Sequence, residues 1–150
     1  MDSSEANRLR DTFDKIVGCI QQGKPVEAEA LAQRILGDHP NDPNLLLVLG
    51  VALMRQGKFE EALKYLSNSV KNAPELAGGH EQYGLALASV GRLDEAEESL
   101  QTALKLDPNN KTVHLELTRL QTMQGNDEES KKTRDRMFEL NPHWQQLQEA

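Results

Sequence analysis

The chain has 150 residues, of which 37% are hydrophobic and 27% are charged, and its formal net charge is −7. A chain of this sign is repelled by nucleic-acid backbones and anionic membranes, and no block of Lys and Arg interleaved with aromatic residues offsets the charge. The longest apolar run, residues 45–54, is too short to cross a bilayer. We therefore expect neither nucleic acid nor a membrane as a partner.

The N-terminus and the cysteine content both bear on the compartment. Residues 1–10 are acidic and polar, where a secretory signal would be basic and then apolar. Cys19 is the only cysteine, so the chain forms no internal disulfide. Both features are typical of a protein of the reducing cytoplasm, which is the location we expect.

Two kinds of helix-breaking residue recur along the chain with one spacing. Glycines lie 34 residues apart at Gly23, Gly57, Gly91 and Gly125. Prolines keep the same spacing at Pro40, Pro74, Pro108 and Pro142. Because two independent series share one period, the chain is predicted to consist of repeated units that stack on one another.

The expected elements are helices that alternate with these breakers. A polar lead-in offers Ser3 and Ser4 as caps of the first helix. Helix pairs are expected over residues 6–22 and 25–36, then 44–55 and 59–72, then 78–90 and 93–106. The connections between them are short, so no flexible linker divides the chain.

The fourth unit is more polar than the others. It keeps the glycine and the proline, but it has Thr118, Ser130 and Arg134 where the third unit has Gly84, Ala96 and Leu100. A polar last helix is typical of the capping unit of a repeat protein. Residues 145–150 are then expected to begin a capping or continuing helix.

The residues between the breakers follow a known pattern. The second unit carries Leu46, Leu49, Gly50, Leu53, Ala62, Leu66 and Pro74, and the third carries His80, Tyr83, Gly84, Leu87, Ala96, Leu100, Ala103 and Pro108. This pattern resembles the tetratricopeptide repeat (TPR) family, whose 34-residue unit is a helix-turn-helix with large and small apolar residues at such places. The first unit departs from it, with Ile16 in place of the small residue.

The resemblance implies a fold and a division of the chain. The fold is all-α, a right-handed α-solenoid (superhelix) of antiparallel helix pairs with a short C-terminal helix. The first helix of each pair would line the concave side. Residues 1–150 would form a single TPR domain, with repeats over 9–42, 43–76, 77–110 and 111–144.

Residues with reactive side chains have structural interpretations. His80 and His114 occupy equivalent places in successive repeats, and helical spacing brings no third metal ligand near them, so we expect imidazoles that pack between helices. Cys19 shares its place with Leu53 and Leu87, which predicts a buried and inert thiol. We expect no metal, no cofactor and no catalytic residue.

Acidic pairs also have an ordinary interpretation. Glu97 with Glu98, and Glu128 with Glu129, are expected on solvated faces of the second helices, without apolar shielding to raise a pKa. Single glycines at turns do not make a phosphate-binding loop.

The function implied by the resemblance is a protein–protein interaction scaffold that binds a peptide or partner segment in a concave groove, with no catalysis of its own. Two alternatives stay open. One is the N-terminal interaction or oligomerisation module of a larger bacterial enzyme, such as a sulfotransferase or hydroxylase fusion. The other is an assembly factor that self-associates, and the C-terminal end is where we expect association.

One known use of the family is the capture of the acidic C-terminal tail of chaperones by basic and amide side chains. The matching places in this chain hold Phe13, Val17, Val48, Gly78 and Gln82. Because none of these is a cation, we expect that an acidic chaperone tail does not bind.

The candidate groove follows from the helix expected over residues 44–55, which is apolar on more than one face. Its inward stripe leaves Leu47, Val51 and Met54, spaced i, i+4 and i+7, as a second apolar row. This row is either buried where neighbouring first helices abut or open to a ligand. The candidate residues are Phe13, Val17, Ile20, Asn44, Leu47, Val51, Met54, Arg55, Glu81, Leu85, Leu115 and Arg119. The expected ligand is an extended or helical peptide with apolar anchors and a basic residue near Glu81.

Overall fold

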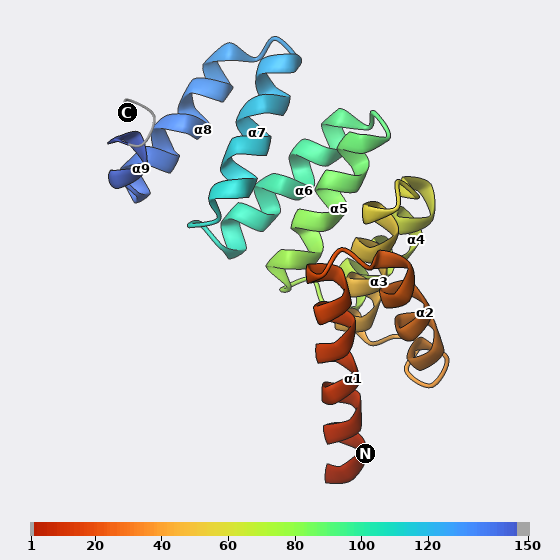
Figure 1. The fold of residues 1–150 in the computed structure, drawn as a ribbon. Coiled ribbons are helices and arrows are strands. Elements are labelled where there is room, and N and C mark those ends of the chain that lie inside the picture. Colours follow the sequence, from red (N-terminus) through yellow and green to blue (C-terminus); the bar gives the residue numbers. More distant parts are fainter. Residues whose placement is uncertain (1, 147–150) are drawn as a thin grey trace.

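The computed structural model describes residues 2–146, which form nine helices and no strand (Figure 1). The helices are α1 (Ser3–Gln21), α2 (Pro25–Leu36), α3 (Pro43–Arg55), α4 (Phe59–Asn72), α5 (Ala77–Ser89), α6 (Leu93–Leu106), α7 (Lys111–Met123), α8 (Asp127–Leu140) and α9 (His143–Gln146). The first eight form four antiparallel pairs that follow one another along a solenoid.

The start of α1 differs from the sequence prediction. Asp2 caps this helix, because its Oδ1 accepts a hydrogen bond of 2.7 Å from the backbone N–H of Glu5. The expected caps Ser3 and Ser4 lie inside the first turn instead. The helix therefore begins three residues earlier than predicted and ends one residue earlier, at Gln21, and its N-terminal part extends away from the other helices (Figure 1).

Glycine ends the turn within each helix pair. Gly23, Gly57, Gly91 and Gly125 all have a positive φ, between 72° and 81°. A residue with a Cβ atom is strained in this left-handed region. The 34-residue glycine series thus marks the one place in each unit where the backbone requires glycine.

The first helix of each pair forms the inner wall of the solenoid. We call α1, α3, α5 and α7 the A helices, and α2, α4, α6 and α8 the B helices. Successive A helices approach one another directly, α1 with α3 and α3 with α5, whereas no B helix makes a comparable contact with the next B helix. Since α1, α3 and α5 lie closer together than the B helices, this part of the solenoid curves toward its A side.

The core lies between the helices of each pair, where large residues face small ones. Leu66 on α4 lies against Gly50, and a Cβ atom on that glycine would be only 2.5 Å from Leu66 Cδ2. Leu100 and Gly84 repeat this arrangement in the third pair, at 2.9 Å. In the first pair the sizes are exchanged, because Ile16 occupies the glycine position and Ala32 the leucine position, both fully buried. A large residue therefore still faces a small one, and the core of the first pair is filled although its sequence departs from the repeat pattern.

The last pair adds hydrogen bonds between polar side chains to the apolar contacts of Leu117, Leu120 and Met137. Thr133 Oγ1 donates to Gln121 Oε1 over 2.7 Å, and the hydroxyls of Thr122 and Ser130 lie 2.7 Å apart. Gln121, which is 1% exposed, also donates to Glu97 Oε1 over 3.0 Å. Glu97 is therefore half-buried against α7, and the prediction that it is solvated was wrong, whereas Glu98, Glu128 and Glu129 are exposed.

A short helix covers the C-terminal end. Trp144 on α9 is half-buried, and Lys111 Nζ lies 5.4 Å from its ring centroid, a cation–π distance. Asn141 Nδ2 donates to Asn109 Oδ1 over 3.3 Å at the same end. The predicted helix over residues 145–150 thus begins at His143, and residues 147–150 lie outside the described part of the chain.

Candidate binding groove

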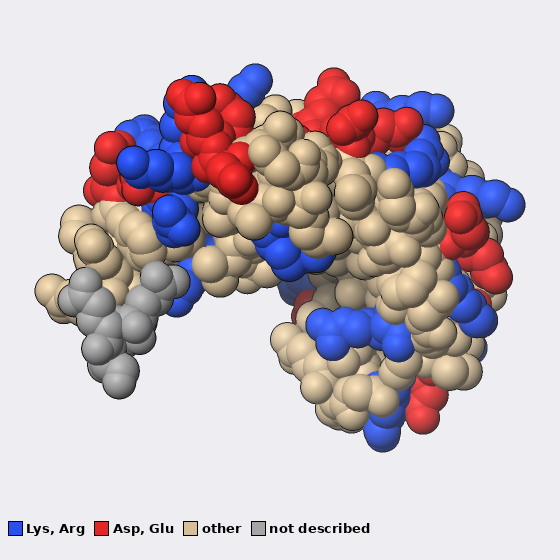
Figure 2. All heavy atoms as spheres, turned by 90° about the horizontal axis from the view of Figure 1, so that it is seen from above, with Lys and Arg blue, Asp and Glu red and all other residues tan. Residues whose placement is uncertain are grey.

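The molecule is an arc around a hollow. Figure 2 shows this arc from above, with most of the acidic side chains visible in that view along its outer edge. The A helices form the wall on the inner side of the curve, as described above. A hollow with a wall of side chains from four helices is a suitable place for an extended ligand.

Apolar side chains of the first three A helices lie on this wall in a half-buried state. They are Phe13, Val17 and Ile20 on α1, Leu47, Val51 and Met54 on α3, and Leu85 on α5. Phe13, Val17, Ile20, Leu47 and Met54 pack partly against the core, and all seven side chains expose part of their surface. The second row is therefore neither fully buried between neighbouring A helices nor fully exposed. Leu47 shows this, because its Cδ2 lies 3.6 Å from where a Cβ of Gly78 would be, so it fills the space beside α5.

The wall is most open at α7. Leu115 is 44% exposed and Met123 is 61% exposed, so both present apolar surface to solvent. Arg119 lies between them in sequence, and its Nε donates to Glu116 Oε2 over 3.0 Å, which raises the pKa of Arg119. Glu81 and Arg119 add charge to the wall, and the exposed Leu115 and Met123 add apolar surface on either side of Arg119 in the sequence.

Glu81 is the half-buried acid of the wall. Its Oε2 accepts a hydrogen bond of 2.9 Å from Asn110 Nδ2, and Asn110 Oδ1 accepts from the backbone N–H of Val113 at the start of α7. Burial raises the pKa of Glu81, the hydrogen bond from Asn110 opposes this, and the charge of Asp107 adds to the increase. Asn110 thus connects α5 to α7 through the acid that the sequence proposed as a ligand contact.

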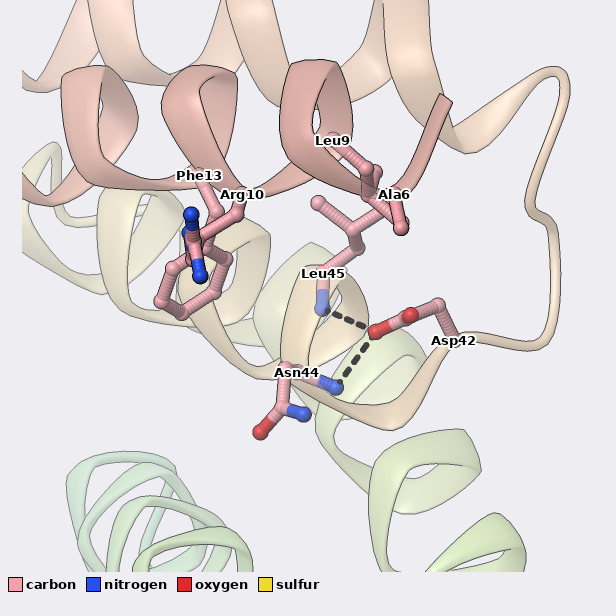
Figure 3. A pocket seen from close by; sticks show the side chains of 7 residues that line it. All are labelled: Ala6, Leu9, Arg10, Phe13, Asp42, Asn44 and Leu45. Carbon is pink, nitrogen blue, oxygen red and sulfur yellow. Dashed lines mark hydrogen bonds between the residues drawn. The ribbon is translucent and has the colours of Figure 1, made fainter. Parts of the chain in front are cut away.

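A pocket of about 360 Å³ lies at the N-terminal end of the wall, between α1 and the start of α3. It is lined by Ala6, Leu9, Arg10, Phe13, Asp42, Asn44 and Leu45. Figure 3 shows Arg10 and Phe13 at one end and Asp42 at the other, with Leu9 and Leu45 between them. Asp42 Oδ1 caps α3 by accepting from the N–H groups of Asn44 and Leu45 over 2.9 and 3.0 Å.

Besides Glu81 and Arg119, two further predicted groove residues contribute polar surface. Asn44 and Arg55 are both exposed, at opposite ends of α3. The pocket adds Arg10, which the sequence analysis did not select. The sequence contained a feature that could have identified Arg10, because it precedes Asn44 by one 34-residue period and therefore holds the same place on α1.

The two histidines have a shared structural role. His80 Nε2 lies 2.7 Å from the carbonyl oxygen of Pro74, and His114 Nε2 lies 2.8 Å from that of Pro108. Each ring therefore donates to the turn that precedes its own helix and holds that turn in place. Among residues 2–146, no group of three or more His, Cys, Asp or Glu side chains could hold a metal ion.

Cys19 is less buried than predicted. It is half-buried, whereas its equivalents Leu53 and Leu87 are fully buried. The reason is its position in the first helix pair, whose outer face no preceding described helix covers. Cys19 lines an open pocket there with Gly18 and Leu31.

Most of the sequence matches a family model. The model is described as "Tetratricopeptide repeat", and it matches residues 20–84 and 87–150. The chain belongs to the tetratricopeptide repeat family. Its fold is accordingly an all-α, right-handed solenoid of antiparallel helix pairs with a short C-terminal helix, as the sequence predicted.

Curated relatives include longer TPR proteins. The chain is 29% identical over 120 residues to "Hsp70-Hsp90 organising protein" of Plasmodium falciparum, a match covering 80% of the chain and 46% of the relative. It is 27% identical over 132 residues to "N-alpha-acetyltransferase 16, NatA auxiliary subunit" of Homo sapiens, covering 87% and 15%. The chain therefore spans less than half the length of each of these relatives.

Solved structures share the TPR fold. "MamA RS-1 ArsTM double mutant" matches with a TM-score of 0.80 and 21% identity, over 89% of this chain and 75% of that one. "First TPR of Spaghetti (RPAP3) bound to HSP90 peptide SRMEEVD" matches with a TM-score of 0.75 and 24% identity, over 83% and 97%. No helix in the described part of this TPR chain is both long and apolar enough to span a membrane.

Proposed function

We propose that the protein is a non-catalytic TPR scaffold that binds a partner peptide along the A-helix wall. The observation that carries this is the half-buried apolar surface of α1, α3 and α5, represented by Phe13, Val51 and Leu85. Side chains in this state can still bury apolar area, which is the main source of binding free energy. Membership of a family whose solved members include a peptide complex supports the same function.

The proposed ligand is a segment with apolar anchors for the α1 and α3 part of the wall and a basic residue near Glu81. Arg55, exposed at the end of α3, is positioned to pair with an acid or a main-chain carbonyl of the ligand. The proposed residues remain those named from the sequence, with Leu115 and Arg119 at the far end of the wall. We place the protein in the cytoplasm.

The test compares two wall variants with a matched control. Val51→Asp and Met54→Ala remove apolar surface from the wall. The control, Val26→Asp, makes the same Val-to-Asp substitution on α2, a B helix, at a position that is 65% exposed. Each variant is bait in a pull-down from the native cell, beside the wild-type chain. A partner retained by wild type and by Val26→Asp, but lost from both wall variants, supports the groove.

The expected effects differ in size. Loss of an anchor contact costs about 2 kcal/mol or more of binding free energy, whereas loss of a rim charge costs under about 1 kcal/mol. Glu81→Gln should therefore weaken binding slightly and reduce its salt dependence. The proposal fails if Val51→Asp unfolds the chain, as read by circular dichroism, or if the retained partner protects the B helices from hydrogen exchange.

The chaperone-tail prediction has its own probe. We expect the peptide SRMEEVD, which the RPAP3 structure contains, not to bind, because Phe13, Val17, Val48, Gly78 and Gln82 offer it no cation. Micromolar affinity for this peptide at low salt, measured by isothermal titration calorimetry, would contradict the prediction.

A second candidate function is a subunit or module that accompanies an enzyme. The observation that favours it is the similarity to an acetyltransferase auxiliary subunit, of which this chain covers a small part. Co-purification of the native protein with a catalytic polypeptide, or fusion to one in the same gene, would support this function over a free-standing scaffold.

A further inference from the structure

The apolar part of the A-helix wall has an unpaired charge near each end. Arg10 on α1 is exposed and forms no ion pair with any residue of the range 2–146. Its one polar contact is a hydrogen bond of 3.3 Å from Nη2 to Asn7 Oδ1. Glu81, two A helices further on, likewise forms no ion pair with a described residue.

The pocket at the first end is suited to a carboxylate. Asp42 lies at its far end (Figure 3) and already accepts two backbone hydrogen bonds at the N-terminus of α3, where the helix dipole offsets its charge. Leu9 and Leu45 separate it from Arg10. The guanidinium of Arg10 is therefore the group in this pocket whose charge is not yet matched, beside an apolar floor.

The second end is suited to a cation. Glu81 is half-buried, and only its Oε2 accepts a hydrogen bond from a described residue. Burial and the nearby charge of Asp107 both disfavour the ionised carboxylate. A ligand ammonium or guanidinium placed there would favour the ionised carboxylate by its opposite charge and so offset both effects.

The separation of the two ends sets a length for the ligand. Arg10 and Glu81 lie on α1 and α5, with α3 between them and in contact with both. Packed helices are about 8–10 Å apart, so the axes of α1 and α5 are about 16–20 Å apart, and a ligand that reaches from Arg10 to Glu81 spans a distance of that order. An extended chain covers this distance in about five to six residues, at about 3.3 Å per residue.

We propose that the wall selects a bipolar peptide, with an acidic side chain at Arg10, a basic side chain at Glu81, and apolar residues between them on Leu47 and Val51. This inference rests on the proposed function and adds the charge pattern of the ligand. Arg10 can pair with one carboxylate of a ligand. A chaperone tail that carries several acids would leave the others without a cation, which agrees with the expectation that such a tail does not bind.

The test is a set of double-mutant cycles between protein and probe. The probe is acetyl-Glu-Ala-Leu-Gly-Leu-Ala-Lys-amide, in which an extended backbone points Glu, both Leu and Lys to one face; it is labelled with fluorescein and followed by anisotropy. Three comparison peptides are used: one has Gln in place of Glu, one has Gln in place of Lys, and one, the rearranged peptide, has the same composition with the two charged residues adjacent. The protein variants are Arg10→Gln and Glu81→Gln, and Arg8→Gln is the control because Arg8 is on the same helix and does not line this pocket.

The expected result is a specific pattern of coupling. Replacing the peptide Glu by Gln should lower the affinity for the wild-type protein by a factor about two to five times larger than for Arg10→Gln. Replacing the peptide Lys by Gln should show a similar difference between wild type and Glu81→Gln. Crossed combinations, and all combinations with Arg8→Gln, should show no coupling. The rearranged peptide should bind more weakly than the parent.

Three outcomes would overturn the inference: no binding of the parent peptide at millimolar concentration, no coupling at either pair, or equal affinity for the rearranged peptide. The variant Val51→Asp shows whether only the proposed charge pattern is wrong or whether the proposed groove is wrong as well. If the couplings are absent but Val51→Asp abolishes binding of the parent peptide, the groove proposal stands. If Val51→Asp leaves binding unchanged, the peptide does not use the groove.

Discussion

Leu66 fills the space that a side chain on Gly50 would need. A Cβ atom at residue 50 would be 2.5 Å from both Cγ and Cδ2 of Leu66, which is itself fully buried. This contact brings α3 and α4 close together, and it makes glycine at position 50 a packing requirement, since its φ is not in the left-handed region.

Gly50→Ala should therefore destabilise the fold. The new methyl group forces Leu66 to move, and overpacking of this kind costs about 1–3 kcal/mol, partly offset by up to about 1 kcal/mol of helix propensity. We expect a net loss of about 1 kcal/mol or more in urea unfolding followed by circular dichroism. Gly18→Ala is the control, because a Cβ atom there has no neighbour within 4 Å. It should stabilise α1 by about 0.5–1 kcal/mol. Equal effects of the two changes would contradict this account.

Leu100→Ala tests whether the solenoid is continuous. Leu100 is fully buried against Gly84, so the substitution leaves a cavity and should cost about 2–5 kcal/mol. Leu93→Ala, at a half-buried position at the start of α6, should cost less. Because neighbouring units share interfaces, hydrogen exchange should speed up in α4 and α8 as well as in α6. Faster exchange confined to α6 would count against a cooperative stack.

Glu81→Gln should change stability in a pH-dependent way. Burial raises the pKa of Glu81 above its ordinary 4.5 in the folded chain, so the native state binds this proton more tightly than the unfolded state does. Stability is therefore lost as the pH rises from about 4.5 through the raised pKa. Glutamine carries no charge and can still accept from Asn110. The variant should be more stable than wild type near neutral pH, with no gain at pH about 4. An equal gain at both pH values would show that ionisation is not the cause.

The C-terminal segment is predicted to shield the last helix pair. Met137 is 1% exposed, while Phe138 and Leu140 are half-buried near α9. A chain that ends at Pro142 loses Trp144 and its contact with Lys111, so apolar surface at this end becomes accessible. We expect this variant to self-associate at high concentration in analytical ultracentrifugation and to melt at a lower temperature. If it stays monomeric and melts like wild type, the segment has no shielding role.

The sequence predicted the helices well because glycine and proline act locally. A glycine with positive φ and a proline after each B helix determine where helices end, whatever packs around them. The start of α1 was missed because Asp2, Ser3 and Ser4 are all good caps, and only the structure shows which one accepts the hydrogen bond from Glu5.

The site was harder to predict because it depends on contacts between units. Periodicity selected Leu47 and Val51 correctly as residues of one row, but it did not show that each is half-buried. Nor did it show that Asn110 binds Glu81, since 29 residues separate them. The unpaired state of Arg10 likewise depends on what surrounds it in space.

Because polar side chains form much of the contact between α7 and α8, the solenoid is expected to begin unfolding at its C-terminal end. Hydrogen bonds such as Thr133 to Gln121 contribute about 0.5–1.5 kcal/mol each, because water competes for both partners, whereas a buried leucine contributes about 1.5–3 kcal/mol. Fraying should therefore begin with α8 and stop at α6, where Leu100 and Ala96 restore an apolar contact. Leu47 and Val51 lie two helix pairs away from that end, and Phe13 lies three pairs away. The part of the wall proposed to hold a ligand would stay assembled while the far end opens and closes.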